Sequence, residues 1–345
     1  MSPSAHRSIA GDDGVSFPPL VSVILPTYNW STVLRHSIRT VLWQSFADFE
    51  LLVVGDACDD DTEDVVAGFR EPRVRWHNLE RNSGNQAAPN NAGLAMARGK
   101  YVAYAHQDDL WMPEHLSVLV RALEEDERTA AHTLILDVGP PPDRIRRVVG
   151  LPGGGTFGAD KVELFTPAVM HRTDAARRIG GWADWRGLRE GPYFDFLNRL
   201  IGSDRDLVSV RELTVLKFHA GLRPNSYVDR RSDEQAEYVE RILSEPDFRA
   251  RELLHAMEDG ARGRRLQALV HWSSDSPPGA YMEQHRTVRG LPPLPSTIAR
   301  RERSLREAVL RPARKLRDVM PGRLRRPLGR ALSRAGSFVV RDAER

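Results

Sequence analysis

The feature that most constrains this chain is the alternation of short apolar runs with helix-like segments through its first hundred residues. The runs VSVILPTYN (21–29), whose strand is stopped by the proline, FELLVV (49–54) and YVAYA (101–105) are rich in aliphatic and aromatic residues, which favours buried strands. Between the first two lies STVLRHSIRTVLWQ (31–44), whose apolar residues recur at helical spacing. Strands joined by helices at this spacing predict βαβ units and an α/β fold with a mostly parallel sheet.

Polar side chains follow three of these predicted strands. Ligands of parallel sheets bind beyond the carboxyl ends of the strands, so we expect these side chains to converge on one site. They are Pro26, Thr27 and Tyr28 after the first strand, Asp56 after the second, and Asp108 and Asp109 after the run 101–105.

Asp108 and Asp109 stand together at the end of an apolar strand, where neighbouring carboxylates repel each other and lose hydration. One interpretation is a solvated strand end, with Asp109 capping a helix that begins near Pro113. The other is a divalent-cation site, since hard cations bind carboxylate oxygens and would neutralise the pair. The stretch AHQDDLW alone leaves both interpretations open.

The composition indicates a soluble globular protein, because 41% of the 345 residues are hydrophobic and the mean hydropathy is −0.45. No run approaches the ~18 apolar residues of a membrane span, and the first 19 residues lack the apolar core of a signal peptide. A single cysteine, Cys58, excludes an internal disulfide. We therefore predict a cytoplasmic protein.

Charge is distributed unevenly along the chain. Residues 297–345 hold 15 Arg and Lys against 5 acids, so this tail is basic and the remaining body is acidic, although the net charge is only +3. An acidic body is a poor partner for nucleic acid. The tail is either a solvated helix face or a peripheral contact with the inner face of a membrane, and we keep membrane contact as a hypothesis.

Composition also predicts the organisation of the chain. We expect a flexible leader at 1–19, an α/β domain at 20–228 and a helical extension at 229–272. A Pro-, Gly- and Ser-rich linker is expected at 273–296, followed by the basic, partly helical tail at 297–345.

Four stretches in order resemble the inverting family-2 glycosyltransferases of the GT-A fold: VSVILPTYN (21–29), QSFADFELLVVGDACDDDT (44–62), NSGNQAAPNNAGLAMARGKYVAYAHQDDLWMP (82–113) and GGW (180–182). The resemblance implies a Rossmann-like, mostly parallel sheet flanked by helices, followed here by a helical C-terminal extension. It also implies transfer of a sugar from a UDP-, GDP- or dTDP-sugar to an acceptor hydroxyl with inversion, assisted by Mg or Mn. The acceptor would be a glycan, a lipid-linked sugar or a small molecule, in polysaccharide or glycoconjugate biosynthesis.

The resemblance places the donor's nucleotide at the first two strand ends. Pro26, Thr27 and Tyr28 fall where the family contacts the nucleotide, with the tyrosine ring suited to stacking on a base. Asp56 falls on the acid that hydrogen-bonds the base edge, while Gly55 replaces an acid that is frequent there.

Further donor contacts are implied elsewhere. Asn85, or Arg81 in the same loop, could approach the base or phosphate, and Asn90 occupies a place where many relatives have arginine. Gln107 stands where an acid is common and can still hydrogen-bond a ribose hydroxyl. Arg223 could pair with the diphosphate.

The metal and the catalytic base complete the implied site. Asp108 and Asp109 align with the family's DxD-like acids, and His219 could supply a further metal ligand. The base is expected in LREGPYFDFLNRL (188–200), where Asp195 aligns best and Glu190 is the second candidate, ahead of Asp184. Tyr193 stands where the usual base would be.

The departures at Gly55, Gln107 and Tyr193 support an alternative from another class, a nucleotide-sugar-binding protein that has lost turnover. The loop PTYNWST after the first strand has no Gly-rich phosphate-binding pattern, which argues against a nucleotidyltransferase or a dinucleotide-dependent oxidoreductase.

Overall fold

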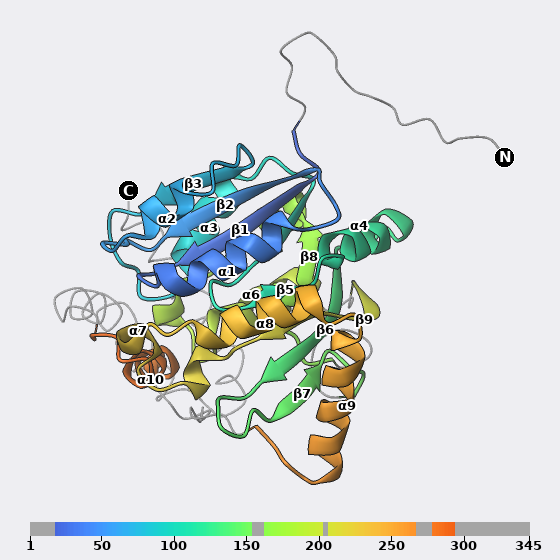
Figure 1. The fold of residues 1–345 in the computed structure, drawn as a ribbon. Helices are drawn as coiled ribbons and strands as arrows, with labels where there is room; N and C mark the ends of the chain where they lie inside the picture. The colour runs from blue at the N-terminus through green and yellow to red at the C-terminus, as the bar shows by residue number, and fades with distance from the viewer. Residues whose placement is uncertain (1–17, 154–161, 203–205, 267–277, 294–345) are drawn as a thin grey trace, which may run out of the picture.

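The computed structural model describes residues 18–153, 162–202, 206–266 and 278–293, and these form a nine-stranded sheet with helices on both faces (Figure 1). The strands are β1 (Val21–Thr27), β2 (Phe49–Gly55), β3 (Val74–Asn78), β4 (Tyr101–Tyr104), β5 (Leu110–Trp111), β6 (Ala130–Val138), β7 (Arg146–Val149), β8 (Val169–Arg172) and β9 (Leu207–Lys217). The helices are α1 (Ser31–Leu42), α2 (Thr62–Ala67), α3 (Ala87–Met96), α4 (His115–Glu125), α5 (Thr173–Arg178), α6 (Pro192–Ile201), α7 (Ser226–Asp229), α8 (Asp233–Ser244), α9 (Phe248–Ala261) and α10 (Ala280–Val288).

The sheet has two halves of different construction. Its order is β3-β2-β1-β4-β8-β6-β9-β5, with β7 paired to β6, and the first four strands are mutually parallel. Val21 lies opposite Phe49 and Tyr101, so β1, β2 and β4 end at the same edge. From β8 onward the pairing is mostly antiparallel. The α/β expectation is confirmed, and the parallel region is the part that the sequence pattern predicts.

The parallel half is buried on both faces, which explains its continuous apolar runs. Alternate residues of β1 point to opposite sides: Leu25 packs with Leu34 of α1, whereas Ile24 packs with Leu94 of α3. Figure 1 shows these two helices on opposite faces of β1 and β2. At Gly93 of α3 an added Cβ would lie 2.4 Å from the Ile24 side chain, so glycine permits this close approach.

The segment after β9 is part of the same core. Tyr238, Val239 and Phe248 of α8 and α9 pack against Leu110 and Leu216 of the sheet, so the predicted helical extension shares the core of the α/β domain. The linker expected at 273–296 is corrected within its described part, because residues 280–288 form α10. Glycines flank this helix at 279 and 290, both at positive φ, and the nine residues of α10 include neither Gly nor Pro.

The basic tail at 297–345 lies outside the described residues, so its contact with a membrane stays a prediction. Among the residues that the structure describes, every helix is too short or too polar to cross a bilayer.

Candidate functional site

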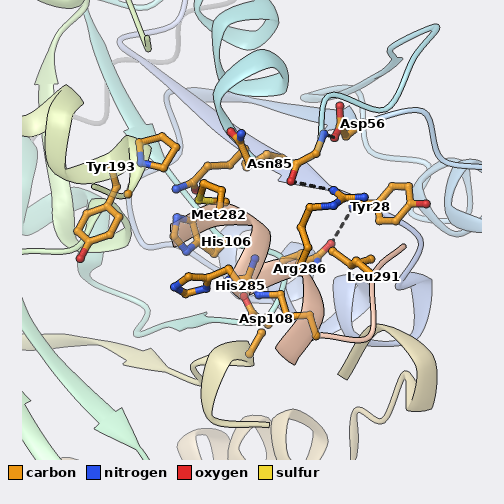
Figure 2. A pocket seen from close by; sticks show the side chains of 18 of the residues that line it. Tyr28, Asp56, Asn85, His106, Asp108, Tyr193, Met282, His285, Arg286 and Leu291 are labelled. Atoms are coloured by element: carbon orange, nitrogen blue, oxygen red, sulfur yellow. Dashed lines mark hydrogen bonds between the residues drawn. The ribbon is translucent and has the colours of Figure 1, made fainter. Parts of the chain in front are cut away.

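A cavity opens where the parallel strands end, and it is closed on one side by α10. Figure 2 shows Asp56 and Tyr28 toward one end, Tyr193 at the opposite end, and Asp108 between them. The lining residues predicted from the sequence are Pro26, Thr27, Tyr28, Asp56, Asn85, Gln107, Asp108, Tyr193 and His219. The structure therefore brings together most of the residues expected at a nucleotide-sugar site.

Asp56 is fixed by the loop that follows β3. Its two carboxylate oxygens accept hydrogen bonds from the backbone N–H groups of Ser83, at 2.9 Å, and Gly84, at 3.2 Å. The side chain is only 4% exposed, and burial raises the pKa of its carboxyl. Each oxygen can accept another hydrogen bond, so Asp56 is a preformed acceptor for a ligand N–H.

The structure explains the glycine at position 55. An added Cβ there would lie 2.4 Å from Asn78 Oδ1 and 2.6 Å from the Trp76 ring. Asn78 is itself fixed, because its side chain exchanges hydrogen bonds with the backbone of Cys58. The frequent family acid therefore has no room beside Asp56.

Gln107 links the end of β1 and the residue after it to α7 at the cavity wall. Its Oε1 accepts from Thr27 Oγ1 at 2.7 Å and from the Tyr28 N–H at 3.0 Å, and its Nε2 donates to Tyr227 Oη at 2.7 Å. Trp30 and Tyr28 contact Tyr227, with ring centroids 5.3 and 6.2 Å apart. The glutamine amide thus holds the aromatic wall of the cavity in place.

Asn85 presents a donor at the cavity wall. Its Oδ1 accepts from the Ala87 N–H at 2.6 Å, while its Nδ2 is buried without a partner among the described residues. Of the two other residues considered near this loop, Arg81 is exposed and Asn90 is fully buried, and both lie outside the cavity lining. An unpaired buried amide at a cavity wall is a candidate ligand contact.

The two adjacent aspartates have different environments. Asp109 Oδ2 lies 2.9 Å from Lys217 Nζ, and its Oδ1 accepts from the Phe218 N–H at 3.0 Å. These contacts, together with His106 at 3.3 Å, hold the pKa of the Asp109 carboxyl well below its usual range despite burial. Asp109 is therefore a satisfied structural acid that joins the β4 loop to β9.

Asp108 is the acid that faces the cavity. Burial and the neighbouring charge of Asp109 raise the pKa of its carboxyl, and no side-chain hydrogen bond to another described residue neutralises it. Ligand atoms of His106, Asp108 and Asp109 all lie within 4.8 Å of one another. His106 was not predicted from the sequence, although it stands two residues before Asp108 in the same loop.

His219 and Arg223 are held by other acids. His219 Nε2 lies 3.1 Å from Asp137 Oδ1, and the ring makes an edge contact with Phe165 at the cavity wall. Among the described residues, His219 is not part of the possible metal-binding cluster of His106, Asp108 and Asp109. Arg223 forms two hydrogen bonds to Glu234, at 2.7 and 2.9 Å, and does not line the cavity.

Of the candidate bases, Glu190 and Asp195 are close to Tyr193 in the sequence, and Asp184 is further away. Asp195 Oδ2 is bound by Arg199 of the same helix at 2.7 Å, and Asp184 accepts from the Arg186 N–H at 3.0 Å. Glu190 precedes three lining residues, Gly191, Pro192 and Tyr193. Burial and the charge of Asp195 raise the pKa of Glu190. The structure places none of the three carboxylates in the cavity lining itself.

Helix α10 supplies lining residues that the sequence interpretation missed: Tyr281, Met282, His285 and Arg286, followed by Arg289 and Leu291. Arg286, labelled in Figure 2, is 5% exposed. Its guanidinium donates to the carbonyls of Gly84, at 3.1 Å, and Pro292, at 2.6 Å. The available signal was the run AYMEQHRTV between two glycines, a short helix pattern within a segment otherwise rich in Pro and Ser.

Comparisons with known proteins agree with this geometry. Residues 22–179 match the family described as Glycosyl transferase family 2. A putative teichuronic acid biosynthesis glycosyltransferase, TuaG from Bacillus subtilis, is 34% identical over 37% of this chain and 53% of its own length. A UDP-Glc:alpha-D-GlcNAc-diphosphoundecaprenol beta-1,3-glucosyltransferase, WfgD from Escherichia coli, is 36% identical over 29% of this chain and 40% of its own length.

The chain thus spans about half or less of these curated relatives. A solved structure, S. aureus TarS 1-349 in complex with UDP-GlcNAc, is similar at a TM-score of 0.49 and 17% identity, over 92% of this chain and 88% of that chain. The family match covers β1 to α5, the part of the chain that carries Tyr28, Asp56 and Asp108. Residues 22–179 of this GT-A-like α/β domain thus match glycosyl transferase family 2, and the chain is similar to glycosyltransferases over that region.

Proposed function

We propose that this chain transfers a sugar from a nucleotide-diphosphate-sugar to an acceptor hydroxyl, with inversion at the anomeric carbon. One observation carries the proposal: a preformed acceptor, Asp56, and an unneutralised acid, Asp108, lie in one cavity of a family-2 domain. The base of the donor would lie against Tyr28 and Asp56, and the diphosphate would lie toward Asp108.

The names of the relatives suggest which donor to test first. WfgD is named for UDP-glucose and a diphosphoundecaprenol-linked acceptor, and TuaG for teichuronic acid biosynthesis. We therefore propose a UDP-sugar donor, with GDP- and dTDP-sugars as the other donors to test. The proposed acceptor is a glycan or a lipid-linked sugar.

The residues present fit a divalent cation. Asp108 offers a cavity-facing carboxylate whose negative charge is not compensated by an ion pair, and hard cations such as Mg or Mn bind such oxygens. Asp109 is less suited as a ligand, because both of its oxygens are already used by Lys217 and Phe218. When bound, the cation would supply Lewis-acid stabilisation of the charge on the leaving nucleoside diphosphate.

The acceptor hydroxyl needs a base at the Tyr193 end of the cavity. We propose Glu190 for this role over Asp195, because Arg199 binds the Asp195 carboxylate. A raised pKa makes the Glu190 carboxylate a stronger proton acceptor once it is ionised. Tyr193, whose pKa is raised by burial, keeps its proton and serves as a wall for the acceptor.

The test is release of nucleoside diphosphate from UDP-, GDP- and dTDP-sugars with Mn or Mg, measured with and without a glycan acceptor. We expect metal-dependent release of nucleoside diphosphate from one donor. Release should be slow without acceptor, through hydrolysis of the donor, and faster when the acceptor is present. Binding of a donor without any release would support the alternative, a nucleotide-sugar-binding protein that has lost turnover.

A further inference from the structure

Helix α10 is anchored to three separate loops around the cavity. Its N-terminal side is joined through the Gly279 N–H to the Leu188 carbonyl at 2.8 Å. Its C-terminal end accepts hydrogen bonds from Asn225, onto Val288 at 2.9 Å, and from Tyr227, onto Arg289 at 3.3 Å. Arg286 adds a bond to Gly84 in the loop that holds Asp56. A helix outside the family-matched residues is therefore a fixed wall of the cavity.

The positive charges that line the cavity differ in their partners. Lys217 is paired with Asp109, and His219 with Asp137. Arg286 is directed at two backbone carbonyls. Arg289 lines the cavity with its Nε buried and without a hydrogen-bond partner, and no described carboxylate forms an ion pair with it. Among the cavity-lining residues that the structure describes, Arg289 is thus a cationic group available to a ligand.

Arg289 lines the cavity just after the end of α10. It lies three residues after Arg286 and so on the same side of the chain, about one helical turn further along. Arg289 and Asp108 line the same cavity. The Arg289 guanidinium also lies 6.0 Å from the centre of the Tyr227 ring, part of the aromatic wall.

We propose that Arg289 binds the diphosphate of the donor, and that Arg286 is a positioning residue that fixes α10 to the loop holding Asp56. This inference rests on the proposed function, since it names a ligand contact within the same site. A guanidinium matches phosphate oxygens with two parallel hydrogen bonds, and a diphosphate is the part of the donor that carries its charge. The C-terminal segment then completes a site that the family domain alone leaves open on one side.

The experiment compares nucleotides with nucleosides. Wild type and Arg289→Gln are titrated by calorimetry with UDP, GDP and dTDP, and with uridine, guanosine and thymidine by displacement. For the nucleotide that the wild type binds, we expect Arg289→Gln to lower its affinity by about tenfold or more, because a charge-assisted hydrogen bond is lost. Affinity for the matching nucleoside should change by less than about twofold, because the residue does not contact the base.

Two further variants separate binding from folding. Arg289→Lys keeps the charge but loses the two-pronged geometry, so we expect it to recover part of the affinity for the diphosphate. Arg35→Gln removes an exposed arginine of α1 outside the cavity and should change neither affinity. Thermal unfolding without ligand shows whether each variant folds.

Three results would overturn the proposal. Equal loss of nucleotide and nucleoside affinity in Arg289→Gln would mean that the residue only supports the wall. Tighter nucleotide binding in that variant would mean that α10 blocks the site. If the wild type binds none of the three nucleotides, the proposed function fails and this inference fails with it.

Discussion

At one end of the cavity, Asp56 and Tyr28 follow parallel strands of the sheet, whereas at the other end Tyr193 and His219 are placed by α6 and by the loop after β9. The first pair is positioned by strands whose register is fixed on both sides. The second pair stands outside the strands, on α6 and after β9, and β9 pairs with β6 with register shifts. The two ends of one site are therefore built by different means.

The difference shows how a shared fold can carry a particular chemistry. The Asp56 end depends on backbone geometry that a parallel sheet enforces, so the proposed nucleotide binding is tied to the fold itself. The Tyr193 end is made of α6 and of loops, which can vary without disturbing the four parallel strands. We expect substitutions at the first end to weaken binding of the nucleotide, and those at the second end to affect acceptor use and proton transfer.

The largest expected effect concerns the base at the Tyr193 end. Glu190→Gln should lower kcat/KM for transfer by about 10²- to 10⁴-fold, which is the usual contribution of a general base. Because the pKa of Glu190 is raised, wild-type activity should increase with pH through a range above that of an ordinary glutamate, and this rise should disappear in the variant.

Asp195→Asn is the matched control, because it removes a neighbouring carboxylate that is bound by Arg199. We expect a much smaller loss of kcat/KM in this variant. The pKa of Glu190, seen in the acid limb of the pH profile, should fall because the repelling charge of Asp195 is removed. Loss of activity in Asp195→Asn with little change in Glu190→Gln would instead assign the base to Asp195.

The next effect concerns the buried ion pair between Lys217 and Asp109. Lys217→Met leaves the buried Asp109 carboxylate without its cation, so the free energy of unfolding at neutral pH should fall by about 3–5 kcal/mol. Lys217 lowers the pKa of Asp109, so the stability that it contributes is present above the ordinary aspartate range and is lost as the pH falls. The difference in the free energy of unfolding between wild type and Lys217→Met, measured by urea denaturation, should therefore become smaller as the pH is lowered.

Lys100→Met is the control for that measurement. Its partner Glu124 lies at 2.6 Å, but both side chains are close to half exposed, at 47% and 45%. A surface pair of this kind should contribute no more than about 1 kcal/mol. Similar losses in the two lysine variants would contradict the structural role given to Asp109.

A smaller effect is expected at Gly55, beside Asp56, where this chain departs from the family that it resembles. Gly55→Ala should lower the free energy of unfolding by about 1–3 kcal/mol, because the new Cβ meets Asn78 and Trp76. Gly55→Asp restores the frequent acid but should lose at least as much stability and gain no nucleotide affinity. Gly260→Ala in α9, where an added Cβ meets nothing within 4 Å, should be neutral or slightly stabilising. Improved nucleotide binding in Gly55→Asp would show that the space beside Asp56 can open.

The sequence predicts the Asp56 end of the cavity better than the Tyr193 end, because a strand pattern can be read from the sequence whereas side-chain partners cannot. The strands around β1 are continuous apolar runs because both faces are buried, and the edge rule then predicts that Asp56 and Asp108 converge. At the other end, sequence pattern cannot show that Arg199 binds Asp195 or that Asp137 binds His219, since these partners depend on side-chain directions. α10 was missed because its Pro- and Ser-rich flanks dominate the local composition.

The pair Asp108 and Asp109 illustrates both outcomes. Their position at the sheet edge was predicted, but the division of roles between them was not, because it depends on Lys217, more than a hundred residues away in the sequence. Only the three-dimensional arrangement shows that one acid is neutralised and the other is available to a ligand.

The most direct test of the central claim, that this cavity is a metal-assisted nucleotide site, is calorimetric titration of UDP, GDP and dTDP with and without Mn or Mg, on the wild type and on Asp108→Ala. We predict metal-dependent binding of one nucleotide that is lost in Asp108→Ala, because the carboxylate available to the cation is removed. Binding that depends on neither the metal nor Asp108, or no binding at all, would contradict the account.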